Sequence, residues 1–262
     1  MSRRKLAGHR VVVTGASSGI GQELAVQLAA LGCRLIINAR RVDRLQTLVD
    51  SIRRTGGDVE PVPGDITEPA TREAILARAL DCWKGLDILI NNAGIGAIGP
   101  FAEADDRRLR RVMDVNFFAP CALTRSAIPL LAEGEQPLIV NISSVLAHRG
   151  VPLKSEYCAS KFALHGWSDA LRAELTDQGI DVLLVSPATT DSEFFDNVIE
   201  NTTRRDWKLS SARSPATVAR QAIRGMQRGR HEVFTSWGGR GLVWLDRIFP
   251  GLANRVVARF GK

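Results

Sequence analysis

Tyr157 is the only tyrosine of the 262-residue chain, and Lys161 follows it by four positions. On a helix this spacing places both side chains on one face, so that the lysine ammonium can lie beside the phenol. A phenol has a pKa of about 10 and exchanges protons poorly at neutral pH unless a nearby positive charge favours the phenolate. The pair therefore indicates a proton donor or acceptor, although an ordinary surface helix could also carry these two residues.

A glycine-rich turn follows a short apolar strand near the N-terminus and reads TGASSGIG over residues 14–21. A strand that ends on glycines and turns into a helix, here expected over Gln22–Leu31, brings backbone N–H groups and a positive helix end to a phosphate. Gly15 permits the tight turn, Gly19 lets the main chain approach a pyrophosphate, and Gly21 lets the helix pack closely. We predict a dinucleotide site formed by Gly15, Ser17, Ser18, Gly19, Ile20 and Gly21.

The second apolar segment, Arg34–Ala39, ends in Arg40 and Arg41. A site specific for NAD usually carries an acidic residue here for the ribose 2′-hydroxyl, whereas a guanidinium can pair bidentately with a 2′-phosphate. The two arginines could also simply open the next helix on its solvent side. Because the acid is missing under either interpretation, we predict NADP(H), preferred over NAD(H).

In this order, the glycine-rich turn, the basic strand end and the Tyr157/Lys161 pair resemble the short-chain dehydrogenase/reductase family in its single-domain form, from about His9 to about Val233. The resemblance implies a catalytic set made of Asn116, Ser144, Tyr157 and Lys161. It further implies cofactor contacts from Asp65, Ile66, Asn92, Ala93, Gly94, Tyr157, Lys161, Pro187, Thr190 and Ser192.

One position departs from the family pattern, because Ala188 follows Pro187 where the family usually has glycine. If the backbone there needs a positive φ, the added Cβ strains the turn by about 1 kcal/mol, and otherwise the change is harmless. Aligned on Pro187, Thr190 and Ser192 fall where the family contacts the nicotinamide carboxamide.

The residues and the resemblance predict an oxidoreductase that interconverts a carbonyl and an alcohol on an apolar or lipid-like substrate, with Tyr157 as general acid or base. Ser144 would hydrogen-bond the reacting oxygen, and by resemblance Asn116 would hold a water of a proton relay to Lys161. A non-catalytic NADP(H)-binding sensor or scaffold is the alternative, and an epimerase is less favoured. The residues expected to line an apolar pocket are Phe101, Leu146, His148, Pro152, Leu153, Phe194, Phe195 and Trp207, although a solvated loop position is favoured for His148.

Seven strand-like segments alternate with helical ones, the last over His231–Thr235, and the length suits one core. The predicted fold class is α/β, a Rossmann-type doubly wound, mostly seven-stranded parallel sheet with helices on both faces. We expect a catalytic domain over residues 1–236 and a basic amphipathic extension over residues 237–262, packed on or beside it. A membrane-spanning helix is not expected because no run of 18 apolar residues occurs, and the start of the chain does not resemble a signal peptide.

The positive charge gathers in the C-terminal part, which has 13 Lys and Arg against three acidic residues after position 200. Apolar residues recur there at helical intervals, with arginines expected on the opposite side and a break at Pro250. A subunit contact in a homodimer or homotetramer, or a cover over the pocket, is favoured for this segment. A peripheral membrane contact comes second, and nucleic acid is not expected because no binding motif accompanies the charge.

The four cysteines and four histidines are scattered without paired spacing. This pattern predicts reduced thiols, a cytoplasmic location with peripheral membrane contact as a second option, and no metal site.

Overall fold

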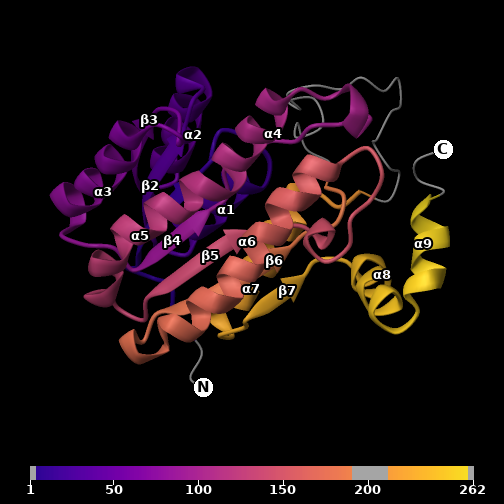
Figure 1. Cartoon of the computed structure of the whole chain (residues 1–262). Helices are drawn as coiled ribbons and strands as arrows, with labels where there is room; N and C mark the ends of the chain where they lie inside the picture. Colours follow the sequence, from indigo (N-terminus) through magenta and orange to yellow (C-terminus); the bar gives the residue numbers. More distant parts are fainter. Residues whose placement is uncertain (1–3, 191–211, 259–262) are drawn as a thin grey trace.

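The computed structural model describes residues 4–190 and 212–258. The described residues form a seven-stranded sheet in the order β3-β2-β1-β4-β5-β6-β7, and every neighbouring pair is parallel (Figure 1). The strands are β1 (Arg10–Thr14), β2 (Arg34–Ala39), β3 (Asp58–Pro63), β4 (Ile88–Asn91), β5 (Leu138–Ile142), β6 (Asp181–Ser186) and β7 (Glu232–Phe234). The strand order reverses between β1 and β4, which confirms the predicted doubly wound fold.

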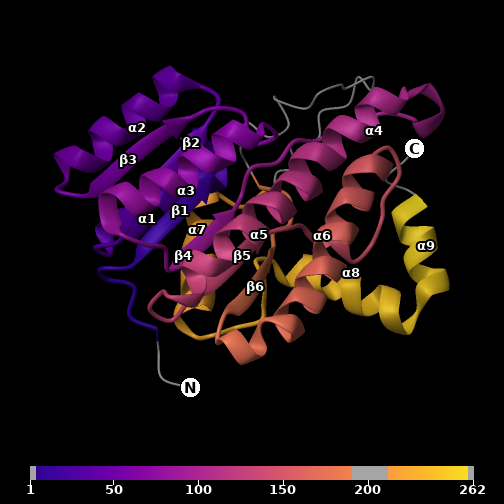
Figure 2. The same cartoon turned by 60° about the vertical axis from the view of Figure 1, so that its left-hand side comes forward.

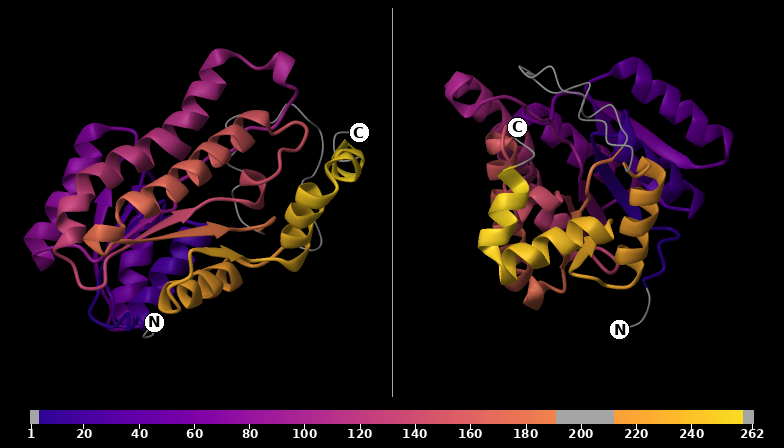
Figure 3. Two further views of the ribbon diagram at one scale, coloured as in Figure 1. Left: turned by 60° about the horizontal axis from the view of Figure 1, so that its bottom comes forward. Right: turned by 90° about the vertical axis from the view of Figure 1, so that its right-hand side faces the viewer.

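Helices cover both faces of this sheet (Figure 3). The main helices are α1 (Gly19–Ala30), α2 (Val42–Arg54), α3 (Pro69–Trp83), α4 (Asp106–Met113), α5 (Ala119–Ala132), α6 (Ser155–Glu174) and α7 (Pro215–Gln227). Val11 and Val13 of β1 pack in the core formed with α1, α2 and α7, whereas Val12 packs with α3 and α5 on the other face. Side chains on both faces of the strand are buried because a parallel sheet between two helical layers has no face exposed to solvent.

The connection between α4 and α5 departs from α-helical geometry. Between α4 and α5 the segment Asp114–Phe118 is a π turn, so the continuous helical run extends from Asp106 to Ala132. By length and composition this run could cross a membrane, contrary to the expectation from the sequence. In the structure α5 contributes Leu123, Ala127 and others to the core beneath the sheet, as the core helix of a folded domain does.

Two short helices end the described chain, α8 (Trp237–Ile248) and α9 (Pro250–Ala258), and the break at Pro250 confirms the sequence prediction. They lie together at one end of the molecule (Figure 1 and Figure 2). Helix α8 contacts β7 and a single 3-10 turn, η3 (Val145–Ala147). The domain boundary at residue 236 stays a prediction, and α8 begins directly after it.

Candidate active site

The predicted cofactor and catalytic residues lie mostly on the turns that follow the carboxyl ends of β1 to β6 and on the helix α6. The turns after β1 and β4 stand side by side where the strand order reverses. From there the chain enters α1 on one face of the sheet and reaches α5 on the other. In open α/β sheets this position forms the crevice in which ligands bind.

The glycine-rich turn is braced by the segment after β4. Gly15 has φ +68°, and a Cβ there would stand 2.7 Å from the Ala93 Cα. The Asn92 side-chain amide donates to the carbonyl oxygens of Thr14 (2.9 Å) and Gly15 (3.0 Å). A Cβ on Gly21 would collide with the same amide nitrogen, so both glycines are required by close packing.

Helix α1 begins at Gly19, three residues earlier than the expected Gln22. Its N-cap residue Ser18 makes no side-chain capping hydrogen bond, and the first turn contains no acidic residue. The N–H groups of this turn therefore have no capping side chain, and the positive end of the helix dipole lies at the same place. This is the arrangement that accommodates a phosphate.

The predicted basic pair borders the same turn. The Arg41 guanidinium donates to the hydroxyls of Ser17 (3.1 Å) and Ser18 (2.8 Å). Arg40 instead lies 3.8 Å from a carboxylate oxygen of Asp65. Burial alone would raise the pKa of Asp65, but hydrogen bonds from Thr67 and the charge of Arg40 lower it below its usual value. Asp65 thus caps the local turn and precedes the buried Ile66.

Three of the four predicted catalytic side chains meet at the start of α6. The Ser144 and Tyr157 hydroxyls share a hydrogen bond, and Ser144 Oγ also accepts from the Leu146 N–H at 3.1 Å. Lys161 Nζ lies 5.7 Å from the centroid of the Tyr157 ring and donates to the Ile142 carbonyl oxygen at 2.9 Å. The helix therefore presents phenol and ammonium on one face, as the spacing predicted.

Burial shifts both acid–base groups of this pair. It raises the pKa of Tyr157, an effect that the hydrogen bond with Ser144 partly offsets. It also lowers the pKa of Lys161 from its usual 10.5 to about 8. The phenol is thus protonated at neutral pH, and the lysine is charged below a pH of about 8.

Asn116 lies in the π turn and is almost wholly buried. Its side-chain oxygen accepts from the Ile95 N–H, and its amide donates to the Ile95 carbonyl (2.9 Å each). The amide also donates to Ser160 Oγ at 3.0 Å, and that hydroxyl donates to the Tyr157 carbonyl oxygen. A Cβ on Gly94 would lie within 4 Å of both Asn116 Oδ1 and Lys161 Nζ, so the asparagine and the lysine border one small space.

A family model described as short chain dehydrogenase matches residues 9–203. The chain belongs to the short-chain dehydrogenase family. Dehydrogenase/reductase SDR family member 7B of Mus musculus is 33% identical over 266 residues, which cover 98% of this chain and 82% of that protein. Dehydrogenase/reductase SDR family member 7 of Homo sapiens is 37% identical over 196 residues, 73% of this chain and 57% of that protein. This membership makes the protein an oxidoreductase that uses a nicotinamide cofactor.

Solved structures show the same fold. A short-chain dehydrogenase/reductase from Burkholderia phymatum, in complex with NAD, superposes with a TM-score of 0.87 at 24% identity and covers 95% of this chain and 96% of its own. A dehydrogenase/reductase from Sinorhizobium meliloti 1021 gives 0.79 at 30% identity and covers 90% of this chain and 97% of its own.

The loop after β6 keeps an ordinary backbone in this short-chain dehydrogenase. Ala188 is not among the described residues with positive φ, so its Cβ causes no backbone strain. The Pro187 carbonyl accepts from the Val145 N–H at 2.9 Å, and Thr190 is buried with its hydroxyl donating to the Ala188 carbonyl. The loop is thereby tied to the segment that carries Ser144. Ser192 lies outside the described residues.

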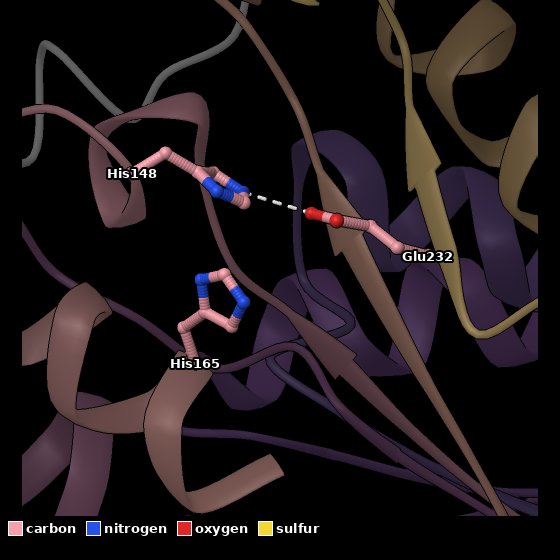
Figure 4. A group of neighbouring side chains, drawn as sticks. All are labelled: His148, His165 and Glu232. Carbon is pink, nitrogen blue, oxygen red and sulfur yellow. Dashed lines mark hydrogen bonds and ion pairs between the residues drawn. The ribbon is translucent and has the colours of Figure 1, made fainter. Parts of the chain in front are cut away.

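His148 is not the solvated loop residue that the sequence favoured. Its side chain is 3% exposed, and its Nε2 lies 2.8 Å from a carboxylate oxygen of Glu232 (Figure 4). Because an ionised carboxylate only accepts, the proton of this bond is on His148. The Ser186 hydroxyl donates to the same oxygen at 2.7 Å, and these bonds lower the pKa of Glu232 although burial would raise it.

His165 stands against His148 with the ring centroids 4.4 Å apart, so two histidines that are distant in sequence are neighbours in space. The ligating atoms of His148, His165 and Glu232 lie within 4.8 Å of one another, as a metal site requires. In the structure His148 hydrogen-bonds Glu232, and His165 Nε2 lies 3.2 Å from a carboxylate oxygen of Asp169. We infer that the contact between His148 and Glu232 holds the segment after Ser144 against β7.

Besides His148, the expected substrate side has four described residues. Phe101 is 68% exposed, Leu146 and Pro152 are partly exposed, and Leu153 adopts φ +66°. Phe194, Phe195 and Trp207 lie outside the described residues.

Sequence reasoning missed Thr14, whose hydroxyl accepts from the Asn92 and Ala93 N–H groups (3.0 and 3.1 Å) and so joins the turns after β1 and β4. Its position as the last residue of the strand before the glycine-rich turn was the available signal.

Proposed function

We propose that this short-chain dehydrogenase is NADP(H)-dependent and interconverts a carbonyl and an alcohol on an apolar or lipid-like substrate, with Tyr157 as general acid and base. The observation that carries the proposal is the hydrogen-bonded Ser144 and Tyr157 pair beside the buried ammonium of Lys161. These groups combine a proton donor, a second hydrogen-bonding hydroxyl and a nearby positive charge in one place.

The chain's own residues fit the cofactor. The first turn of α1, with no side-chain acceptor on its N–H groups, would hold the pyrophosphate, and Lys161 would hold the nicotinamide ribose. When bound, NADP(H) supplies or accepts the hydride. Although the similarly folded Burkholderia phymatum protein is in complex with NAD, Arg40 and Arg41 support the 2′-phosphate here, because no carboxylate ends β2.

The acid–base groups favour the reductive direction. Because burial raises its pKa, Tyr157 keeps its proton at neutral pH and can give it to a carbonyl oxygen. The Ser144 hydroxyl is placed to donate to the same oxygen and stabilise its developing charge. The phenolate left after transfer is stabilised by the Lys161 ammonium, and Asn116, which borders the same space, orients the path by which the proton returns.

The first test is oxidation of NADPH against ketones and aldehydes graded by chain length and ring size, with NADH in parallel. Replacing Tyr157 with Phe removes the proton donor and keeps the ring, so turnover should fall by at least about a hundredfold while NADPH binding persists. Equal turnover by Tyr157→Phe would overturn the assignment of the acid. NADPH binding without turnover on any substrate would favour the sensor alternative.

Cofactor preference has its own test. Arg41→Ala should raise the KM for NADPH about tenfold or more, because a charge-assisted contact to the 2′-phosphate is lost, and should leave the KM for NADH nearly unchanged. Arg54→Ala, an exposed arginine at the far end of α2, is the matched control. Equal effects of Arg41→Ala on both cofactors would contradict NADP(H) preference.

A further inference from the structure

Helices α8 and α9 carry a concentration of exposed apolar side chains. Trp237, Trp244, Ile248, Phe249 and Leu252 are exposed by 80, 51, 59, 60 and 50%. In the remainder of the described chain, only Val42, Phe101 and Phe118 among the large apolar residues are at least half exposed. Single exposed apolar residues are normal in proteins, but five of them on two adjacent helices and the residue that joins these helices indicate an interaction surface. We call these five residues, with the arginines described next, the α8–α9 surface.

The charges on this surface have one sign. Arg240, Arg247 and Arg255 are all exposed. The single acidic residue between positions 237 and 258 is Asp246, and its carboxylate is paired with Arg149 at 2.8 Å. The α8–α9 surface therefore presents three guanidinium groups and no free carboxylate of its own helices. Its charge complements an anionic partner.

Aromatic and basic side chains share one face of α8. Trp237, Arg240, Trp244 and Arg247 follow each other at intervals of three or four residues, and the Arg240 guanidinium stands over the Trp237 ring, 6.0 Å from its centroid. The two tryptophans are at least half exposed and the two arginines are exposed, so this face is not the one that packs on the domain. The inward face is formed instead by Val243 and by Gly239, where a Cβ would stand 2.6 Å from Val145 Cγ1.

We propose that the α8–α9 surface docks on a membrane that contains anionic phospholipid. Tryptophan next to arginine suits the headgroup region, where rings enter the acyl boundary and guanidinium groups meet phosphates. A second copy of the chain fits less well, because a two-fold contact through this surface would place arginines opposite arginines without intervening carboxylates. The proposal does not depend on the catalytic function.

Docking would place the candidate active site next to the lipid. Arg149, which follows the segment that carries Ser144, pairs with Asp246 of α8 and also hydrogen-bonds Asn254 of α9. Helix α8 also approaches the loop after β6 through Gly239, where a Cβ would lie 3.6 Å from the Ala188 Cβ. The docked surface is thus held rigidly beside the turns that follow β5 and β6.

The test is flotation of the full chain with vesicles of phosphatidylglycerol and phosphatidylcholine, and with vesicles of phosphatidylcholine alone. Wild-type protein should float with the anionic vesicles, and binding should weaken as salt is added. Arg240→Gln with Arg247→Gln should lower partitioning on the order of thirtyfold, because each arginine near the surface contributes about a fivefold factor. Trp244→Ser with Ile248→Ser should lower it about tenfold or more, with less dependence on salt.

The matched control is Leu80→Ser with Arg78→Gln on α3, where the same kinds of exposed residue lie at the opposite end of the molecule (Figure 1). Circular dichroism and thermal unfolding establish that each variant is folded. The control should float like the wild type. The proposal is overturned if wild-type protein does not float with anionic vesicles, or if the control loses as much binding as the α8 variants. It is also overturned if light scattering shows that the α8 variants dissociate an oligomer while vesicle binding is unchanged, since the surface would then be a subunit contact.

Discussion

Helix α6 buries two charged groups, Glu156 and Lys161, which are five residues apart. In the described chain Glu156 has an ion-pair partner, and Lys161 has none. The Glu156 carboxylate lies 2.6 Å from Arg108, with both side chains nearly inaccessible. Burial alone would raise the pKa of Glu156, but hydrogen bonds from Arg108, from its own backbone and from Ser155 lower it. Lys161 is equally buried, and in the described chain its ammonium donates only to a carbonyl oxygen, so burial lowers its pKa to about 8.

The difference distinguishes a paired structural charge from the charge that we propose to act in catalysis. A buried ion pair whose partners satisfy each other costs little net stability, whereas a buried cation without a counter-ion is destabilising. Lys161 lies beside Tyr157 despite this cost, which is typical of residues whose shifted pKa serves chemistry.

The largest expected change in the free energy of unfolding comes from breaking the ion pair of Arg108 and Glu156. Arg108→Met leaves Glu156 buried and unpaired, and should lower the free energy of unfolding by about 3–5 kcal/mol in urea denaturation. Arg110→Met, on the solvent side of the same helix α4, is the control and should change stability little. Equal losses in the two variants would show that the Arg108 pair has no special role.

An intermediate effect of opposite sign is expected at the functional charge. Lys161→Met should abolish turnover yet raise the free energy of unfolding by about 1–3 kcal/mol at neutral pH, since an unpaired buried charge is removed. The folded-state pKa of Lys161 is depressed to about 8, so the unfolded chain binds more protons than the folded one between pH 8 and 10.5. The stability gain of the variant should therefore be full below pH 8 and shrink toward pH 10.5, as measured by urea denaturation at several pH values. A gain that grows with pH would refute this account.

The smallest change in the free energy of unfolding is expected when Arg108 and Glu156 are both replaced by apolar residues. Arg108→Met with Glu156→Leu removes both charges and keeps apolar volume, so the free energy of unfolding should stay within about 1 kcal/mol of the wild type. If the double variant is as unstable as Arg108→Met alone, unpaired charge is not the reason for the loss in the single variant.

The sequence predicted the features that depend on neighbours along the chain. The glycine-rich turn, the phenol and ammonium on one helix face, and the break at Pro250 each arise from local spacing, and the structure confirms them. The doubly wound sheet followed from the alternation of strands and helices.

Other features arise from contacts between distant segments, which leave no local pattern. Glu232 meets His148 only because β7 lies beside β6, and 84 residues separate the two. The π turn at Asp114–Phe118 contains neither glycine nor proline, so its extra residue leaves no break signal in the sequence. Localisation, oligomeric state and the division at residue 236 stay predictions.

The Arg4 side chain anchors the beginning of the described chain near the amino ends of the strands. The candidate active site lies at their carboxyl ends. The Arg4 guanidinium donates to the carbonyl oxygens of Gln136 and Met226 and pairs with Asp181, beside the starts of β5 and β6. An affinity handle or fluorophore attached ahead of Arg4 would therefore be anchored on the side of the sheet opposite the carboxyl ends of the strands. Immobilised in that orientation on a sensor chip, the enzyme would present both its crevice and α8 to the flowing solution.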